Sequence, residues 1–166
     1  MKTSTGTMTR NNTTLNSVTR FMKAMKQPVN VQWDNKTAEL RYNLLLEELN
    51  EVKEAISYMS AEQIRHGKPS VVAEAELLKE LCDLQYVLDG FFATFGYLKE
   101  PAFNRVHASN MSKLDDDGKP IYREDGKVLK GPNYKTQCFG VNFPKTFLIK
   151  NTNMKEPKHG QNYVLL

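Results

Sequence analysis

Two long stretches of the chain repeat apolar residues at steps of three and four. This spacing predicts two amphipathic helices. The first is expected over residues 36–59, with Leu40, Leu44, Leu45, Leu49, Val52, Ile56 and Met59 on its apolar face. The second is expected from an N-cap at Ser70 to about Phe95, with Gly96 as its stop. The break at 60–69, with a possible cap at Ser60, is short, so the two helices are expected to pack antiparallel.

Two shorter helices are predicted on either side of this pair. Residues 15–26 carry apolar side chains at helical spacing, with Asn16 or Ser17 as the N-cap and Gln27-Pro28 as the stop. Residues 101–111 begin with a proline, which fits the first turn of a helix. The side chains of this last helix expected to face inward are Phe103, Val106 and Met111.

Helical patterning ends after residue 113. Asp125-Gly126 is a strong two-residue turn signal and predicts a β-hairpin between Lys119–Arg123 and Lys127–Lys130. The chain is therefore expected to be all-α, an antiparallel helical bundle with a small hairpin. Its expected parts are a flexible N-terminus at 1–14, an all-α domain at 15–113, a closing hairpin at 114–135, and an irregular tail at 136–166 with one strand at Thr146–Ile149.

Composition excludes several classes of protein. With 166 residues, 40% hydrophobic and 25% charged, the chain fits one soluble globular domain. It has no run of about 18 apolar residues, so no transmembrane helix is expected. Residues 1–14 lack the apolar core of a secretory signal. Cys82 and Cys138 form no paired-cysteine motif, which favours reduced thiols and a cytoplasmic protein.

Charge is distributed unevenly. Residues 36–130 hold 13 basic and 17 acidic side chains, whereas the segments on either side are each net positive. The basic ends suggest an anionic partner, and one interpretation of them is a non-catalytic module that binds nucleic acid or another protein. That interpretation leaves the acidic middle of the chain unexplained.

Acidic residues on the two long helices point to metal chemistry. Glu47, Glu48 and Glu51 lie on the first helix, and Glu80 and Asp83 lie on the second. Spacings of three and four place such side chains on one face of a helix. If the helices pack antiparallel, the two groups face each other, and their repulsion demands cations. Carboxylate oxygens suit Mg²⁺ or Mn²⁺. The alternative is an ordinary solvated acidic surface.

The segment Val106–Lys113 gathers polar side chains at a helix end. Asn110 and Lys113 are suitable partners for phosphate oxygens, and Lys127 could close over a polyphosphate. The alternative is a plain polar helix end followed by solvated lysines.

The ordered motifs resemble a known enzyme group. EELNE at 47–51, ELCDLQYVLDG at 80–90, FNRVHASNMSK at 103–113 and DGKVLKGPNY at 125–134 are similar to the all-α NTP pyrophosphatase superfamily. Within it, they resemble the MazG-like branch related to phosphoribosyl-ATP pyrophosphohydrolases, which includes dUTP-hydrolysing members (dUTPases). The resemblance covers about residues 18–135.

The resemblance implies a hydrolase that cleaves between the α and β phosphates of a nucleoside triphosphate and releases a monophosphate and pyrophosphate. The substrate expected first is dUTP or a related dNTP. It implies Mg²⁺, with Mn²⁺ as a substitute. It implies phosphate binding by Asn110 and Lys113. The implied metal ligands are Glu47, Glu48, Glu51, Glu80 and Asp83, with Glu47 alternatively orienting or deprotonating the attacking water.

Base selection is expected at the N-terminal helix and the loop after it. Phe21 and Trp33 could stack on a base. Gln27 or Asn30 could form a hydrogen bond with the edge of the base, and Tyr86 could face the sugar. The alternatives are core packing for Phe21 and loop anchoring for Trp33. Arg41 could reach a phosphate or lie on the helix surface, and the second role is the one expected.

The expected assembly is a four-helix core completed by a homodimer or a tetramer, as the resemblance implies. No membrane partner is expected, and a nucleic-acid partner is disfavoured. An alternative activity is hydrolysis of phosphoribosyl-ATP itself.

Overall fold

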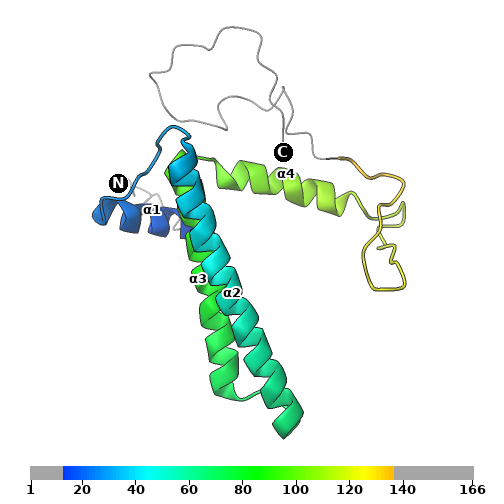
Figure 1. Cartoon of the computed structure of the whole chain (residues 1–166). Coiled ribbons are helices and arrows are strands. Elements are labelled where there is room, and N and C mark those ends of the chain that lie inside the picture. Colours follow the sequence, from blue (N-terminus) through cyan, green and yellow to red (C-terminus); the bar gives the residue numbers. More distant parts are fainter. Residues whose placement is uncertain (1–12, 137–166) are drawn as a thin grey trace, which may run out of the picture.

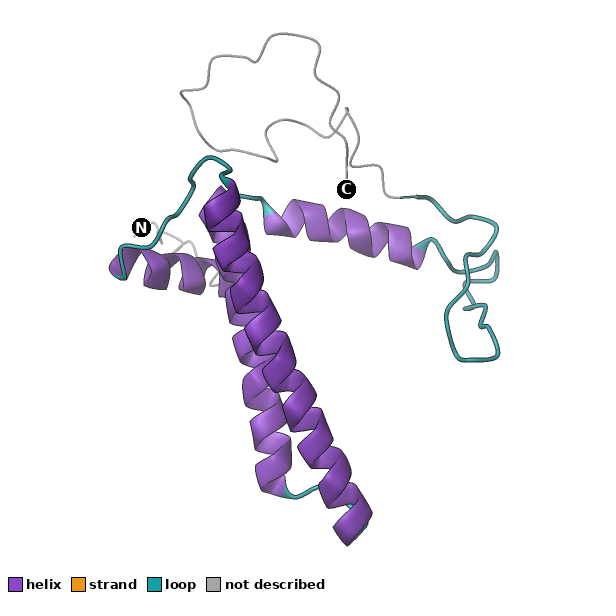
Figure 2. Ribbon diagram, in the orientation of Figure 1, coloured by secondary structure: helices purple, strands orange, loops and turns teal. Residues whose placement is uncertain are grey.

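The chain folds into a helical hairpin with one shorter helix at each side of its open end (Figures 1 and 2). The structure, a computed structural model, describes residues 13–136. The helices are α1 (Thr14–Ala24), α2 (Asn35–His66), α3 (Val71–Phe95) and α4 (Lys99–Met111). Residues 13–136 hold no β-strand, so the all-α prediction is confirmed. The expectations for residues 1–12, for the tail from 137 onward and for its strand at Thr146–Ile149 lie outside the described residues.

The long hairpin forms where the sequence predicts it, but α2 is longer than expected. The helix continues through Ser60, whose Oγ donates to the carbonyl of Ile56 instead of capping a new element. It ends at Gly67, whose φ of 74° lies in the left-handed region that glycine tolerates best. Ser70 then caps α3 by accepting a hydrogen bond from the amide of Ala73, as predicted.

α1 packs against α3 near the open end of the hairpin (Figure 1). Val18 and Met22 of α1 are buried against Ala93 of α3, and the three side chains form a small apolar core. The N-cap of α1 is Thr13, not the predicted Asn16 or Ser17, because the side chain of Thr13 accepts from the amide of Asn16.

Arg41 connects this core to α2, so the expectation that it decorates the helix surface is wrong. Its side chain is buried, and Nη2 donates to Oε1 of Gln27 at 3.3 Å. Burial lowers the pKa of the guanidinium.

α4 leaves the open end of the hairpin and runs away from both long helices (Figure 2). Phe103 and Met111 are therefore 61% and 52% exposed, and the expectation that they face inward is wrong. An ion pair with a buried carboxylate fastens the start of α4, because Lys99 Nζ lies 2.6 Å from Oδ1 of Asp89 on α3. At the far end, Ser109 Oγ donates to the carbonyl of Lys135, which holds the following loop against the helix.

The predicted β-hairpin is present as an isolated antiparallel bridge between Tyr122 and Val128. Arg123 donates its amide to the carbonyl of Lys127, and Gly126 takes a positive φ of 83° in the turn between them. The turn therefore lies where Asp125-Gly126 predicts it, without flanking strands.

Within residues 13–136, much of the predicted apolar face of the hairpin is left exposed. Val52 is buried, whereas Leu40, Leu49 and Ile56 are 54%, 52% and 50% exposed. On α3, exposed apolar side chains include Val72, Leu78 and Leu81. Exposed leucines in such number are typical of surfaces that bind another protein. None of the described helices is both long and apolar enough to cross a bilayer.

Candidate active site

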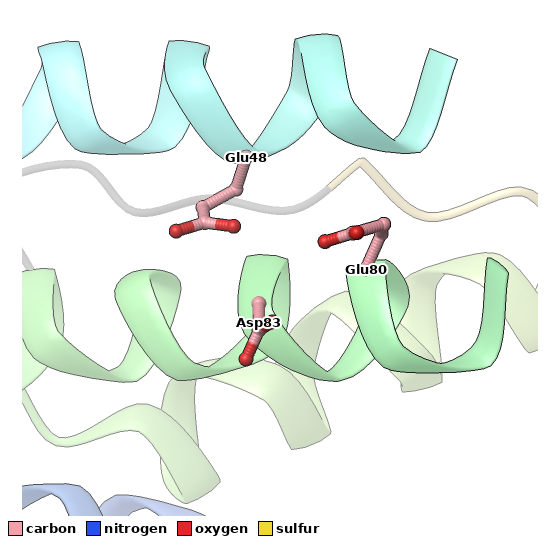
Figure 3. A group of neighbouring side chains, drawn as sticks. All are labelled: Glu48, Glu80 and Asp83. Atoms are coloured by element: carbon pink, nitrogen blue, oxygen red, sulfur yellow. The ribbon is translucent and has the colours of Figure 1, made fainter. Parts of the chain in front are cut away.

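Three carboxylates from the two long helices converge about midway along the hairpin. Glu48 comes from α2, and Glu80 and Asp83 come from α3 (Figure 3). One carboxylate oxygen from each lies within 4.8 Å of the others. The geometry arises because α2 and α3 pack antiparallel with the acidic residues beside the apolar contact, as the spacing predicts.

Lys79 is the cationic neighbour of these carboxylates. Its Nζ lies 2.8 and 2.9 Å from the two oxygens of Glu80 and 3.2 Å from Oδ2 of Asp83. Hydrogen bonding from Lys79 lowers the pKa of Glu80, although the residue is 5% exposed. The same contacts raise the pKa of Lys79. Glu80 is therefore held as an anion by a cation on its own helix.

The pKa values of Glu48 and Glu51 on α2 shift in the opposite direction. Removal from water, followed by the charges of Asp83, Glu47 and Glu80, raises the pKa of Glu48. A hydrogen bond to Glu80 raises the pKa of Glu51. Glu51 is thus the fourth predicted ligand in direct contact with the group. This crowding of acidic groups favours a proton or a cation between the helices.

Glu47 differs from the other four predicted metal ligands. Its side chain is exposed, and it is not part of the three-carboxylate group. It still lies close enough for its charge to act on Glu48.

An open pocket of about 440 Å³ adjoins the carboxylates on the side of the hairpin tip. It is bounded by Glu51, Glu54, Ala55, Tyr58, Val72, Glu76 and Glu80. The pocket is strongly acidic, so an anionic ligand would need cations to enter it.

The predicted phosphate-binding residues lie elsewhere in the chain. Asn110 and Lys113 are paired with each other at the end of α4, where Lys113 Nζ donates to Asn110 Oδ1 at 2.8 Å. Lys127 is exposed beside the turn, and its amide donates to Asp125. α4 points away from the hairpin, so within one chain these groups are not brought to the carboxylates (Figure 1).

Two of the predicted base-binding residues come together. Phe21 on α1 and Tyr86 on α3 meet edge to face with their ring centroids 5.6 Å apart. Gln27 instead accepts a hydrogen bond from Arg41. Trp33 packs on Phe95 with a centroid separation of 4.7 Å, next to Phe91, which agrees with loop anchoring.

A second pocket, of about 370 Å³, lies between α1 and α3, and Tyr86 forms part of its wall. Gln85 and Asp89 also line it, and both were missed by sequence reasoning. Gln85 Nε2 and Asp89 Oδ2 are buried and have no hydrogen-bond partner among the described residues. Their spacing of four residues within an apolar helix could have identified them as a polar pair on one face.

The three-carboxylate group suits a hard divalent cation. It offers oxygen donors, with no histidine or cysteine among the three, and Mg²⁺ and Mn²⁺ prefer oxygen ligands. The pKa of Glu48 is raised by neighbouring negative charge as well as by burial, and a cation would remove that penalty.

Comparison with known proteins identifies the family. The sequence pattern of the phosphoribosyl-ATP pyrophosphohydrolase family matches residues 16–110, which is more than half of the chain. The chain belongs to this family. The resemblance to all-α NTP pyrophosphatases is thereby confirmed, and this member of the phosphoribosyl-ATP pyrophosphohydrolase family is a nucleotide pyrophosphohydrolase.

Solved structures also match this chain. One of them is a crystal structure from Exiguobacterium sp. 255-15, described provisionally as an NTP pyrophosphohydrolase, with 21% identity and a TM-score of 0.37. The similarity covers 75% of this chain and 88% of that chain. A search of curated proteins finds no significant match.

Proposed function

We propose that this family member is a Mg²⁺-dependent nucleoside triphosphate pyrophosphohydrolase. It cleaves between the α and β phosphates and releases a nucleoside monophosphate and pyrophosphate, with dUTP or a related dNTP as the preferred substrate. The observation that carries the proposal is the convergence of Glu48, Glu80 and Asp83 between α2 and α3. Mn²⁺ is expected to substitute for Mg²⁺, since both take oxygen ligands.

The carboxylates have separate tasks in this proposal. Glu48, Glu80 and Asp83 hold the cation, and Glu51 joins them through its contact with Glu80. When bound, Mg²⁺ neutralises phosphate charge and lowers the pKa of a coordinated water. Glu47 is the proposed group that orients or deprotonates the attacking water, and its electrostatic contact with Glu48 supports a position at the edge of the site.

The aromatic pair of Phe21 and Tyr86 is the proposed contact for the base and sugar. The two residues are 41% and 39% exposed, so part of each ring is accessible to a ligand. Stacking on an aromatic face favours a base without selecting its identity. Gln27 and Trp33 are proposed to affect base binding indirectly, through the loop that carries them. Both side chains already contact other residues of the protein.

A second copy of the chain is proposed to complete the site. The exposed leucines of α2 and α3 form the proposed dimer surface, with a tetramer as the alternative. Phosphate binding by Asn110, Lys113 and Lys127 then requires that the α4 end of one copy reach the carboxylates of the other.

This assembly gives a direct prediction of mass in solution. Sedimentation equilibrium should give at least twice the 19.0 kDa of one chain. Leu49→Glu should lower the assembly state, because it places a charge in the proposed apolar surface. A protein that sediments as a 19.0 kDa monomer at assay concentrations would contradict the proposal.

A substrate panel tests the activity. We expect pyrophosphate and a monophosphate from dUTP with Mg²⁺, and no product when the cation is chelated. The panel should include the common ribo- and deoxyribonucleoside triphosphates and phosphoribosyl-ATP. The family match makes phosphoribosyl-ATP the second candidate substrate. Folded protein that releases no pyrophosphate from any member of the panel would overturn the proposal.

A further inference from the structure

Lys79 is the one lysine among residues 13–136 that forms ion pairs with the carboxylates of the proposed metal site. It lies on an exposed part of α3 and contacts two of the three carboxylates, both on the same helix. Its three contacts use both oxygens of Glu80 and one oxygen of Asp83. Two of these contacts are hydrogen bonds to Glu80, and the third is an ion pair with Asp83.

Ordinary pairing on a helix surface does not explain this arrangement. Neighbouring residues on a helix do not face each other, yet Lys79 reaches both oxygens of Glu80. Lys79 precedes Asp83 by four residues, and a pair at this spacing stabilises a helix less when the lysine comes first. The Glu80 side chain is 6% exposed and turned into the hairpin, so Lys79 must bend inward to meet it.

We propose that Lys79 is a displaceable internal cation, which holds the carboxylates together without metal and leaves them when a divalent ion binds. This inference rests on the proposed metal role of Glu80 and Asp83. A divalent ion held by Glu80 and Asp83 would share carboxylate oxygens with the ammonium of Lys79. Two cations on the same oxygens repel each other, so binding of the ion disfavours the ammonium and binding of the ammonium disfavours the ion.

The surroundings of Lys79 allow that departure. Its side chain is 57% exposed, whereas the Asp89-bound Lys99 is 20% exposed. A long flexible stem and an open water-facing side let the ammonium swing out without repacking the core. Lys79 is thus a positioning residue that sets the affinity of the site for its metal.

Mn²⁺ binding by the full chain tests the inference, with free ion counted by electron paramagnetic resonance. Lys79→Met should bind Mn²⁺ about tenfold more tightly than the parent protein, since a competing cation and its repulsion are removed. Lys79→Arg keeps a competing cation and should stay within about twofold of the parent. Lys79→Gln provides a second neutral variant.

Two further measurements distinguish displacement of Lys79 by the metal ion from a general effect of net charge on metal affinity. Lys53→Met removes one positive charge from the exposed side of α2 in the same hairpin, and it should leave Mn²⁺ affinity within about twofold. The Tm of metal-free Lys79→Met should fall, and its rise on adding Mn²⁺ should exceed that of the parent.

The outcomes distinguish this inference from the proposed function. If the parent binds no Mn²⁺, the metal role of the carboxylates fails first. If the parent binds Mn²⁺ and both neutral Lys79 variants bind no more tightly, only the displacement role of Lys79 is overturned. Equal tightening by Lys53→Met and Lys79→Met would also overturn it, because the effect would then be one of net charge.

Discussion

Glu48→Gln and Asp83→Asn should each lower pyrophosphate release by more than about 100-fold while the helical circular dichroism spectrum stays unchanged. Loss of a group that merely supports a metal ligand typically costs 10–100-fold, so loss of a ligand itself should cost more. Both substitutions keep the shape of the side chain and remove its charge. Both side chains are partly exposed, so an amide can find water, and the fold should be retained.

The matched control is Glu39→Gln, which removes the same charge from an exposed position of α2 outside the carboxylate group. It should keep full activity. Activity and Mn²⁺ binding are measured in parallel for all variants. Full turnover in either Glu48→Gln or Asp83→Asn would remove the proposed metal site.

Glu47→Gln separates the two roles considered for Glu47. If it orients or deprotonates water, kcat should fall while Mn²⁺ affinity is kept. If it is a ligand, Mn²⁺ affinity should fall as well. Its exposed side chain outside the group of three favours the first result.

The hairpin and its carboxylates could be predicted because local signals and tertiary packing agree there. Apolar spacing defines both long helices, and Ser70 and Gly96 mark the start and end of α3. Two acidic groups beside the apolar faces then had to meet once the helices packed antiparallel. Glu48, Glu80 and Asp83 follow directly from that register.

The predictions that were wrong concern features that the spacing of apolar residues does not determine. Sequence spacing places Phe103 and Met111 on one face of a helix, but it does not say whether this chain covers that face. The burial of Arg41 depends on the path of the loop that brings Gln27 to it. α2 continues past Ser60 because a serine hydroxyl can bond the carbonyl four residues earlier and remain inside a helix.

The ion pair of Asp89 and Lys99 could likewise not be predicted from the sequence. Its removal gives the largest expected change in the free energy of unfolding. The Asp89 side chain is fully buried, and its Oδ1 accepts from Lys99 Nζ at 2.6 Å. Lys99 also donates to Thr14 Oγ1 at 3.4 Å, so this one ammonium links α3, α4 and α1. Lys99→Met would leave a buried carboxylate without its counter-ion. The expected loss in free energy of unfolding is about 3–5 kcal/mol.

Urea denaturation followed by circular dichroism measures this loss, with Lys36→Met as the control for removal of an exposed lysine. Removing both partners should cost less than removing one, because no unpaired charge remains buried. Asp89→Leu in the Lys99→Met background should therefore regain part of the lost stability. If Lys99→Met unfolds within about 1 kcal/mol of the parent, as an exposed pair would, the ion pair does not anchor α4. A double variant no more stable than Lys99→Met alone would show that the loss came from packing around the lysine stem instead of from the stranded charge.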